Sequence, residues 1–108
     1  MRKGEFYRVH QPPGDPKHYR VFVVVSRQAL IDARFETVIC APVNTNGSGL
    51  STQVQVGLNE GLKHESWILC DSLTSVRKIA LTQYVGALSA ERIAEVDRAL
   101  SMALDLRF

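Results

Sequence analysis

Short apolar and β-branched runs recur through residues 1–88 and predict a series of strands. Residues 19–25 (YRVFVVV) carry apolar side chains on both faces, which predicts a central, fully buried strand. Residues 53–58 (QVQVGL) alternate polar and apolar positions, as a strand with one exposed face does. In chain order, strands are predicted over residues 5–10, 19–25, 37–43, 53–58, 66–71 and 83–88, with one helical turn over residues 28–33.

Two segments between these strands are rich in turn-forming residues. Residues 11–18 (QPPGDPKH) hold three prolines and one glycine, and proline fixes φ and has no backbone N–H to donate. This segment is therefore predicted to be a loop that leads directly into the buried strand. Residues 44–49 (NTNGSG) are predicted to form a polar turn, in which short side chains bond to the neighbouring backbone.

The hydrophobic period changes at Ser89, a typical helix N-cap residue that precedes Glu91 in the expected first turn. The apolar positions that follow are spaced as one stripe of an amphipathic helix: Ile93, Val96, Leu100 and Ala103 or Leu104. A terminal helix laid on a small, mostly antiparallel sheet or barrel gives an α+β fold. We expect residues 1–108 to form a single domain.

Composition narrows the class of protein. Of the 108 residues, 45% are hydrophobic and 22% are charged, which excludes a disordered or collagen-like chain. No apolar run approaches the roughly 20 residues of a membrane span, and no secretory signal is expected after Met1. Cys40 and Cys70 lack CxxC or CxxH spacing, which predicts buried, inert thiols in a reducing cytoplasm and argues against a zinc ribbon.

The net charge of +2 is small, but it is unevenly distributed. Residues 1–34 hold seven cations and three anions, whereas residues 35–108 hold six cations and eight anions, so the two parts carry +4 and −2. A basic first third predicts a local anion-binding face. Chance variation in a short chain gives the same asymmetry, so charge alone identifies no partner.

Several short segments, taken in order, resemble the MazF/PemK family of toxins from bacterial type II toxin–antitoxin systems. The resemblance covers residues 3–106, nearly the whole chain, and rests on the spacing of segments that are individually weak signals. These segments are Lys3-Gly4-Glu5, the Pro/Gly-rich loop that ends in Arg20 before a Val-rich strand, Ala41-Pro42-Val43 with its polar turn, residues 50–54 (LSTQV), Leu69-Cys70-Asp71, and residues 86–91 (GALSAE) before the last helix.

This resemblance implies a fold, an activity and partners. The fold is a small SH3-like antiparallel β-barrel with a C-terminal amphipathic helix, usually in a cytoplasmic homodimer. The activity is sequence-selective cleavage of single-stranded RNA without a metal ion or other cofactor. The resemblance also implies a cognate antitoxin whose flexible tail covers the RNA groove.

Metal-free RNA cleavage uses the substrate's own 2′-hydroxyl as nucleophile and leaves a 2′,3′-cyclic phosphate and a 5′-hydroxyl. The protein must move protons and stabilise negative charge on a five-coordinate phosphorus, a task that suits the bidentate fork of an arginine. Arg20 matches the family's catalytic arginine between loop and strand, although Val21 follows it where the family usually has proline. The competing interpretation of Arg20 is a strand-end arginine that extends into water.

The turn after the third predicted strand carries the next candidates. The family places a Thr or Ser hydroxyl after its Pro-Ile/Val pair, where it works with the arginine at the scissile phosphate. Here Asn44 occupies that place and Thr45 follows one residue later. Asn44 can donate hydrogen bonds to a phosphate but cannot relay a proton, so Asn44 is predicted to bind RNA and Thr45 to supply the catalytic hydroxyl. Ordinary turn chemistry is the alternative for this segment.

Three further candidates come from the resemblance and from loop chemistry. Asp71 matches an acid that some relatives use as general acid or base, with Ser72 where a glutamine often follows, although a strand-end aspartate is often only a turn acceptor. Lys17 and His18 stand in the loop before Arg20 and are predicted to contact phosphates. The remaining histidines, His10 and His64, lack partners at metal-ligand spacing and are predicted to be structural or exposed, and Trp67 is assigned to the core or a dimer interface.

Two other functions compete with the endoribonuclease. The CcdB gyrase inhibitors share this barrel and poison a protein target, but they depend on a C-terminal tryptophan, whereas this chain ends in residues 105–108 (DLRF). A catalytically decayed RNA-binding module is the third hypothesis, and it is favoured by the departures from the family pattern at Val21, Asn44 and Ser72.

Overall fold

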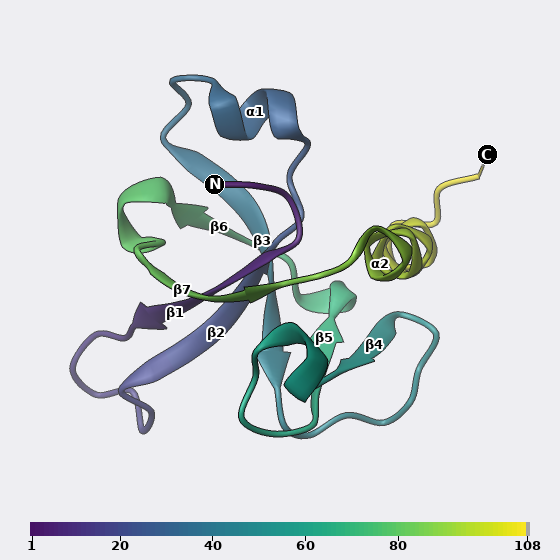
Figure 1. Cartoon of the computed structure of the whole chain (residues 1–108), viewed down its shortest axis with the longest axis horizontal. Helices are drawn as coiled ribbons and strands as arrows, with labels where there is room; N and C mark the ends of the chain where they lie inside the picture. The colour runs from purple at the N-terminus through teal and green to yellow at the C-terminus, as the bar shows by residue number, and fades with distance from the viewer. Residues whose placement is uncertain (108) are drawn as a thin grey trace.

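A computed structural model describes residues 1–107 and shows one curled antiparallel sheet with a long helix packed against it (Figure 1). The strands are β1 (Glu5–His10), β2 (Tyr19–Val24), β3 (Thr37–Asn44), β4 (Gln53–Val56), β5 (Ser66–Leu69), β6 (Thr74–Arg77) and β7 (Gln83–Ala87). The helices are α1 (Gln28–Asp32) and α2 (Ala90–Ala103), with 3₁₀ turns η1 (Leu58–Glu60), η2 (Cys70–Ser72) and η3 (Lys78–Ala80).

The sheet runs in the order β4-β5-β3-β2-β1-β7, and β3 is long enough to serve two partners on one edge. Its first half pairs with β6, from Thr37 opposite Arg77, and its last residues pair with β5, with Asn44 opposite Trp67. Every pairing is antiparallel. The sheet curls so that β4 and β5 lie below the crossing strands in Figure 1, with α2 beside them.

The η1 segment bridges the two ends of the sheet. Its backbone lies so close to β7 that a Cβ on Gly86 would overlap the carbonyl oxygen of Glu60. On the other side of this contact, a Cβ on Gly61 would lie 2.5 Å from the carbonyl oxygen of Val85. The buried Glu60 accepts a hydrogen bond from the Gly57 N–H at 2.8 Å, which shapes the turn. The half-barrel is therefore closed by backbone packing at two glycines rather than by a strand pair.

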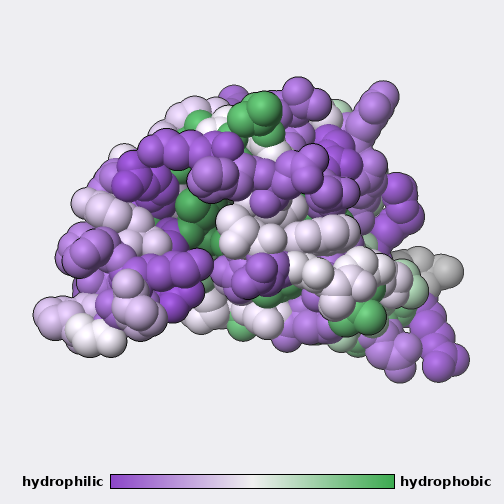
Figure 2. All heavy atoms as spheres, turned by 90° about the horizontal axis from the view of Figure 1, so that it is seen from below, coloured by the Kyte–Doolittle hydropathy of each residue, from purple (hydrophilic) through white to green (hydrophobic). Residues whose placement is uncertain are grey.

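Both faces of the sheet are covered by apolar side chains. Phe6 and Val23 belong to a core cluster that includes Ile68 and, from α2, Val96. Their neighbours in sequence point the other way into a second cluster, which contains Tyr7, Val9, Val24, Val38, Cys40, Leu81 and, from α1, Ile31. Alternation along β1 and β2 thus supplies both clusters. Figure 2 shows the face seen from below, which is mainly hydrophilic, with apolar side chains visible inside a hollow.

The structure confirms most of the predicted elements. All six predicted strands and both helical segments are present, and the Ser89 Oγ caps α2 by accepting a hydrogen bond from the Arg92 N–H at 3.3 Å. Both cysteines are buried as predicted, and burial raises the pKa of Cys40 to about 12 and of Cys70 to about 11, so both thiols stay protonated at neutral pH. Within residues 1–107, no helix is long and apolar enough to cross a membrane.

Three expectations need correction. β6 was not predicted, because its sequence TSVR offers only Val76 as an apolar side chain to pack. The prediction of full burial for residues 19–25 is wrong: only Val23 and Val24 are buried in β2, while Tyr19 is 38% exposed. Tyr19 and Arg20, at the start of β2, are open to solvent, whereas Val21 packs against the edge of the core. On α2, Leu104 lies beyond the last helical residue and is 54% exposed, whereas Ala99 is buried.

Candidate active site

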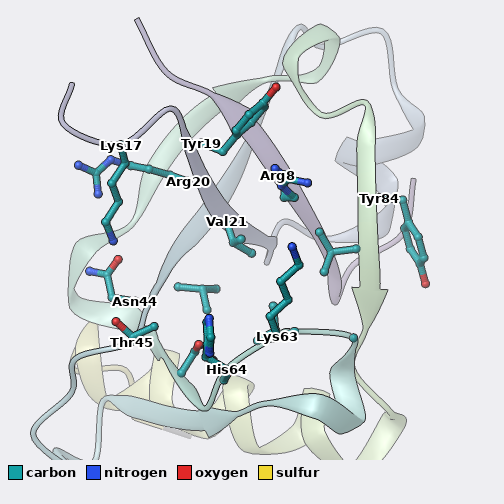
Figure 3. A pocket seen from close by; sticks show the side chains of 15 residues that line it. Arg8, Lys17, Tyr19, Arg20, Val21, Asn44, Thr45, Lys63, His64 and Tyr84 are labelled. Carbon is teal, nitrogen blue, oxygen red and sulfur yellow. Dashed lines mark hydrogen bonds between the residues drawn. The ribbon is translucent and has the colours of Figure 1, made fainter. Parts of the chain in front are cut away.

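A pocket of about 480 Å³ opens where β2 begins and β3 ends (Figure 3). Val21 pairs with Val43, which places the neighbouring Arg20 and Asn44 at the same end of the two paired strands. Because β5 pairs antiparallel with the end of β3, the residues just before β5 lie at this end as well. The described residues that line the pocket are Arg8, Lys17, Tyr19, Arg20, Val21, Val43, Asn44, Thr45, Gly61, Leu62, Lys63, His64, Ser66, Tyr84 and Val85.

The charged side chains around this pocket are all cationic. They are Arg8, Lys17, Arg20 and Lys63, and the described residues of the lining include no carboxylate. Figure 3 shows Lys17 and Arg20 together on one side, Asn44 and Thr45 below them, and Lys63 and His64 extending into the pocket. Like charges on opposite walls repel one another, so this arrangement favours an anion between them.

Arg20 is oriented by Asp15 from the proline-rich loop. The Nε and Nη2 groups of Arg20 each donate a hydrogen bond to the Asp15 carboxylate at 3.0 Å. The Lys17 backbone N–H donates to the same carboxylate at 2.8 Å, which folds the loop back toward β2. These bonds hold the pKa of Asp15 below its ordinary value, and the hydrogen bonds from the Arg20 guanidinium have the largest effect. The carboxylate therefore remains charged at neutral pH and fixes the direction of the guanidinium.

Aromatic side chains hold the opposite wall. The Arg8 guanidinium carbon lies 4.5 Å from the centre of the Tyr19 ring, a distance typical of a cation–π contact. Tyr84 packs edge-on against Tyr7 with ring centres 5.9 Å apart and remains exposed at the rim. Two phenol rings and a guanidinium therefore line this wall, and flat groups of this kind can stack with nucleobases.

Comparison with known proteins identifies the family. The family model described as PemK-like, MazF-like toxin of type II toxin–antitoxin system matches residues 2–104. The chain belongs to the PemK/MazF toxin family. Its sequence is 27% identical over 84 residues to "Endoribonuclease MazF3" of Mycobacterium tuberculosis, covering 78% of this chain and 82% of the relative.

Solved structures share the fold of this PemK/MazF family member. The Mycobacterium tuberculosis toxin MazF-mt6 superposes with a TM-score of 0.83 at 23% identity, covering 96% of this chain and 99% of the toxin. An endoribonuclease in complex with its cognate antitoxin, from a mycobacterial species, superposes with a TM-score of 0.85 at 21% identity, covering 100% and 98%. These similarities confirm the predicted antiparallel, barrel-like α+β fold with a C-terminal helix.

Four of the seven site residues predicted from the sequence of this PemK/MazF chain meet in the pocket. They are Lys17, Arg20, Asn44 and Thr45. His18, Asp71 and Ser72 are absent from the described lining. Asp71 lies in η2, where its carboxylate accepts a hydrogen bond from the Thr52 hydroxyl at 2.6 Å. The roles assigned to all seven residues stay predictions.

The separation of Asp71 from the pocket follows from the direction of β5. Ser66 begins this strand at the pocket, and Leu69 ends it beside η2. A strand rises about 3.3 Å per residue, so the two ends of β5 are about 10 Å apart. Asp71 therefore stands at the far end of the strand whose near end borders the pocket.

Sequence reasoning missed three basic residues of the lining. Arg8 comes from β1, and Lys63 and His64 come from the segment between η1 and β5. His64 is exposed as predicted, but it projects into the pocket (Figure 3). The sequence marks His64 only as a residue just before a predicted strand. This position places His64 near Asn44 only once β5 is known to pair with β3.

Two other predictions concern metals and Trp67. Within residues 1–107, no three or more His, Cys, Asp or Glu side chains come together as a metal-ligand group. Trp67 is half-buried, and a Cβ on Gly47 would overlap its ring, so the polar turn packs directly on the indole. The indole therefore supports the turn that carries Thr45.

Proposed function

We propose that this chain is a sequence-selective endoribonuclease that cuts single-stranded RNA without a metal ion. The observation that carries the proposal is the convergence of four cationic side chains on a pocket that also holds a hydroxyl and an amide. Its membership of the PemK/MazF family and its similarity to a protein named as an endoribonuclease support the same activity. The products expected are a 2′,3′-cyclic phosphate and a 5′-hydroxyl.

The pocket residues divide the work on the scissile phosphate. The 2′-oxygen attacks phosphorus, and the extra negative charge on the equatorial oxygens is stabilised by the Arg20 guanidinium, with Lys17 beside it. Asn44 donates amide hydrogens to a phosphate oxygen, and the Thr45 hydroxyl bonds to the same group. Arg8 and Lys63 hold the neighbouring phosphates, which keeps the strand in register.

The proposed activity brings partners with it. One similar solved structure is an endoribonuclease in complex with its cognate antitoxin, from a mycobacterial species, and another is MazE-MazF from Deinococcus radiodurans. We extend this to the present chain: a cognate antitoxin covers the cationic pocket and blocks RNA. The working form is a cytoplasmic homodimer. An antitoxin segment that enters this pocket is expected to be acidic, because the pocket is lined by cations.

Cleavage in the presence of a chelator tests the activity. Purified protein is incubated with a long, weakly structured single-stranded transcript in excess EDTA, and fragment ends are labelled by polynucleotide kinase without prior phosphatase treatment. Discrete fragments that accept label directly have 5′-hydroxyl ends and are the expected result. Tight binding without cleavage would contradict the activity and favour a decayed RNA-binding module. Neither binding nor cleavage, with arrest of DNA replication in cells, would favour a gyrase-type poison.

Replacing Asp15 with asparagine is expected to separate rate from affinity. The change keeps the side-chain size but removes the carboxylate that orients Arg20. We expect the rate of cleavage of bound RNA to fall between about 10- and 100-fold, because a small misplacement of a catalytic group is costly. Affinity should rise, because one negative charge beside the phosphate is lost. Single-turnover rates measured against protein concentration report both quantities, with Asp32→Asn, an exposed carboxylate on α1, as the control.

The ion pair between Asp15 and Arg20 makes a pH-dependent contribution to the stability of the fold. Because Arg20 lowers the pKa of Asp15 in the folded protein, pairing stabilises the fold above the pKa of the unfolded chain. This contribution is lost as the pH falls through the lowered, folded-state pKa. The difference in melting temperature between the native protein and Asp15→Asn should therefore shrink under acidic conditions. A difference that grows as the pH falls would contradict the pairing.

A further inference from the structure

The proposed reaction needs a group that accepts the proton of the 2′-hydroxyl. The described lining of the pocket holds arginines, lysines and tyrosines, but no carboxylate. Asp71, the acid predicted from the sequence, stands beyond the far end of β5 and is bonded to Thr52. Asp15 is close enough to bond Arg20, but this bond lowers its pKa and makes it a weaker base.

His64 is the one imidazole in the described lining. Figure 3 shows its ring projecting into the pocket between Thr45 and Lys63, on the side of the pocket opposite Tyr19. The ring is exposed, so it can exchange protons with solvent after each turnover. An imidazole combines a donor and an acceptor nitrogen, which suits it to accept a proton near neutral pH.

The backbone that carries His64 is held in place by β5. The hydroxyl of Ser66, a buried residue that begins β5, donates a hydrogen bond to the His64 carbonyl oxygen at 3.0 Å. β5 in turn pairs with the end of β3, with Asn44 opposite Trp67. His64 is therefore anchored two residues before the strand whose start pairs with the end of β3, close to the Asn44–Thr45 turn.

We propose that His64 is the general base of the RNA cleavage reaction, an inference that rests on the proposed function. The neutral imidazole takes the proton of the 2′-hydroxyl as the 2′-oxygen forms its bond to phosphorus. The bond from phosphorus to the 5′-oxygen breaks, and the departing 5′-oxygen takes a proton from water. The imidazolium then returns its proton to solvent, so the enzyme ends the cycle unchanged and no electrons are transferred.

The other charged and titratable groups around His64 limit the possible sources of a pH-dependent step in cleavage rate. The charged and titratable side chains that line the pocket with it are Arg8 from β1, Lys17, Tyr19 and Arg20 from the loop and β2, Lys63 from its own segment, and Tyr84 from β7. Side chains of these types ordinarily titrate above about pH 9. Asp15, next to Arg20, has a pKa below its ordinary value. A step in cleavage rate between about pH 5 and pH 8 that is lost when His64 is replaced would therefore be attributed to its imidazole.

Single-turnover cleavage in EDTA over this pH range tests the proposal. The native protein should cleave faster as the pH rises and then reach a plateau. His64→Gln should lose about 10²- to 10⁴-fold in rate at the plateau and should lose the pH step, while still binding the transcript. His10→Gln removes an exposed imidazole that packs edge-on against Tyr19 but does not itself line the described pocket, and it serves as the control for loss of an imidazole nearby. Equal melting temperatures show that the variants are folded.

Chemical rescue and Asp71 complete the design. In His64→Ala, added imidazole should restore cleavage in proportion to its concentration, which a purely structural role would not produce. An unchanged rate and pH step in His64→Gln would overturn the assignment. A loss of rate in His64→Ala that added imidazole does not restore would overturn it as well. Loss of the pH step in Asp71→Asn alone would return the role to that carboxylate. A native protein that does not cleave the transcript under any of these conditions would reject the proposed function itself.

Discussion

Replacing Arg20 with alanine is expected to slow RNA cleavage by about 10³-fold or more, the scale seen when a charge-stabilising arginine is removed from phosphoryl transfer. Two effects act in the same direction. The guanidinium that faces the developing charge is lost, and the Asp15 carboxylate that it neutralised is left unpaired beside the phosphate. Both raise the energy of the transition state more than that of bound RNA. Initial rates with the mapped substrate in EDTA measure the loss.

Two companion variants separate geometry from charge. Arg20→Lys keeps the positive charge but loses the planar fork, so it should recover only part of the rate. Arg34→Ala removes the same charge from an exposed position outside the described pocket lining and should cleave within about twofold of the native protein, as surface changes away from the site usually do. Equal losses in Arg20→Ala and Arg34→Ala would show that only overall charge matters, and native rates in both would place the reaction elsewhere.

Replacing Gly86 with alanine is expected to lower the free energy of unfolding by about 3 kcal/mol, the upper part of the range for overpacking. The added methyl group would overlap the carbonyl oxygen of Glu60, and that obstacle is backbone rather than a flexible side chain. The η1 segment would have to move away from β7 and open the closure of the half-barrel. Urea denaturation followed by circular dichroism measures the change.

Gly57→Ala is the matched control for this closure. Gly57 precedes η1, and its Cβ would lie 3.7 Å from the Glu65 Cα, an ordinary van der Waals distance. Its φ of −176° is extended backbone that other residues adopt. We therefore expect a change below about 1 kcal/mol, as for surface substitutions without overlap. Comparable stability in both variants would show that the contact between η1 and β7 yields readily.

The elements of the fold are local properties of the sequence, and most of them were predicted. A strand such as β1 needs only its own alternating side chains, and α2 needs its stripe and its Ser89 cap. The neighbours of a strand are set by distant parts of the chain. β6 supplies a single apolar side chain, Val76, and is held by pairing with β3, which leaves little trace in its own sequence.

The site divides in the same way. Arg20 and Thr45 stand at ends of apolar runs, where the sequence marks a boundary between strand and loop. The Asp15 partner of Arg20 depends on how the proline-rich loop folds back, and this follows from hydrogen bonds within the loop. His64 is 44 positions from Arg20 along the chain and meets it only because β2, β3 and β5 are neighbours. Asp71 shows the converse, since it follows a strand of the site but leaves from the other end.

A crystal structure with a substrate analogue tests the central claim that this pocket is the RNA-cleaving site. Once the cut is mapped, a short single-stranded RNA with a 2′-deoxy residue at that position binds without being cut, because the nucleophile is missing. We expect its scissile phosphate within about 3 Å of the Arg20 guanidinium, a hydrogen-bonding distance. The 2′ carbon should face the His64 ring. The same phosphate bound beside η2 and Asp71, or on the outer face of α2, would contradict the claim.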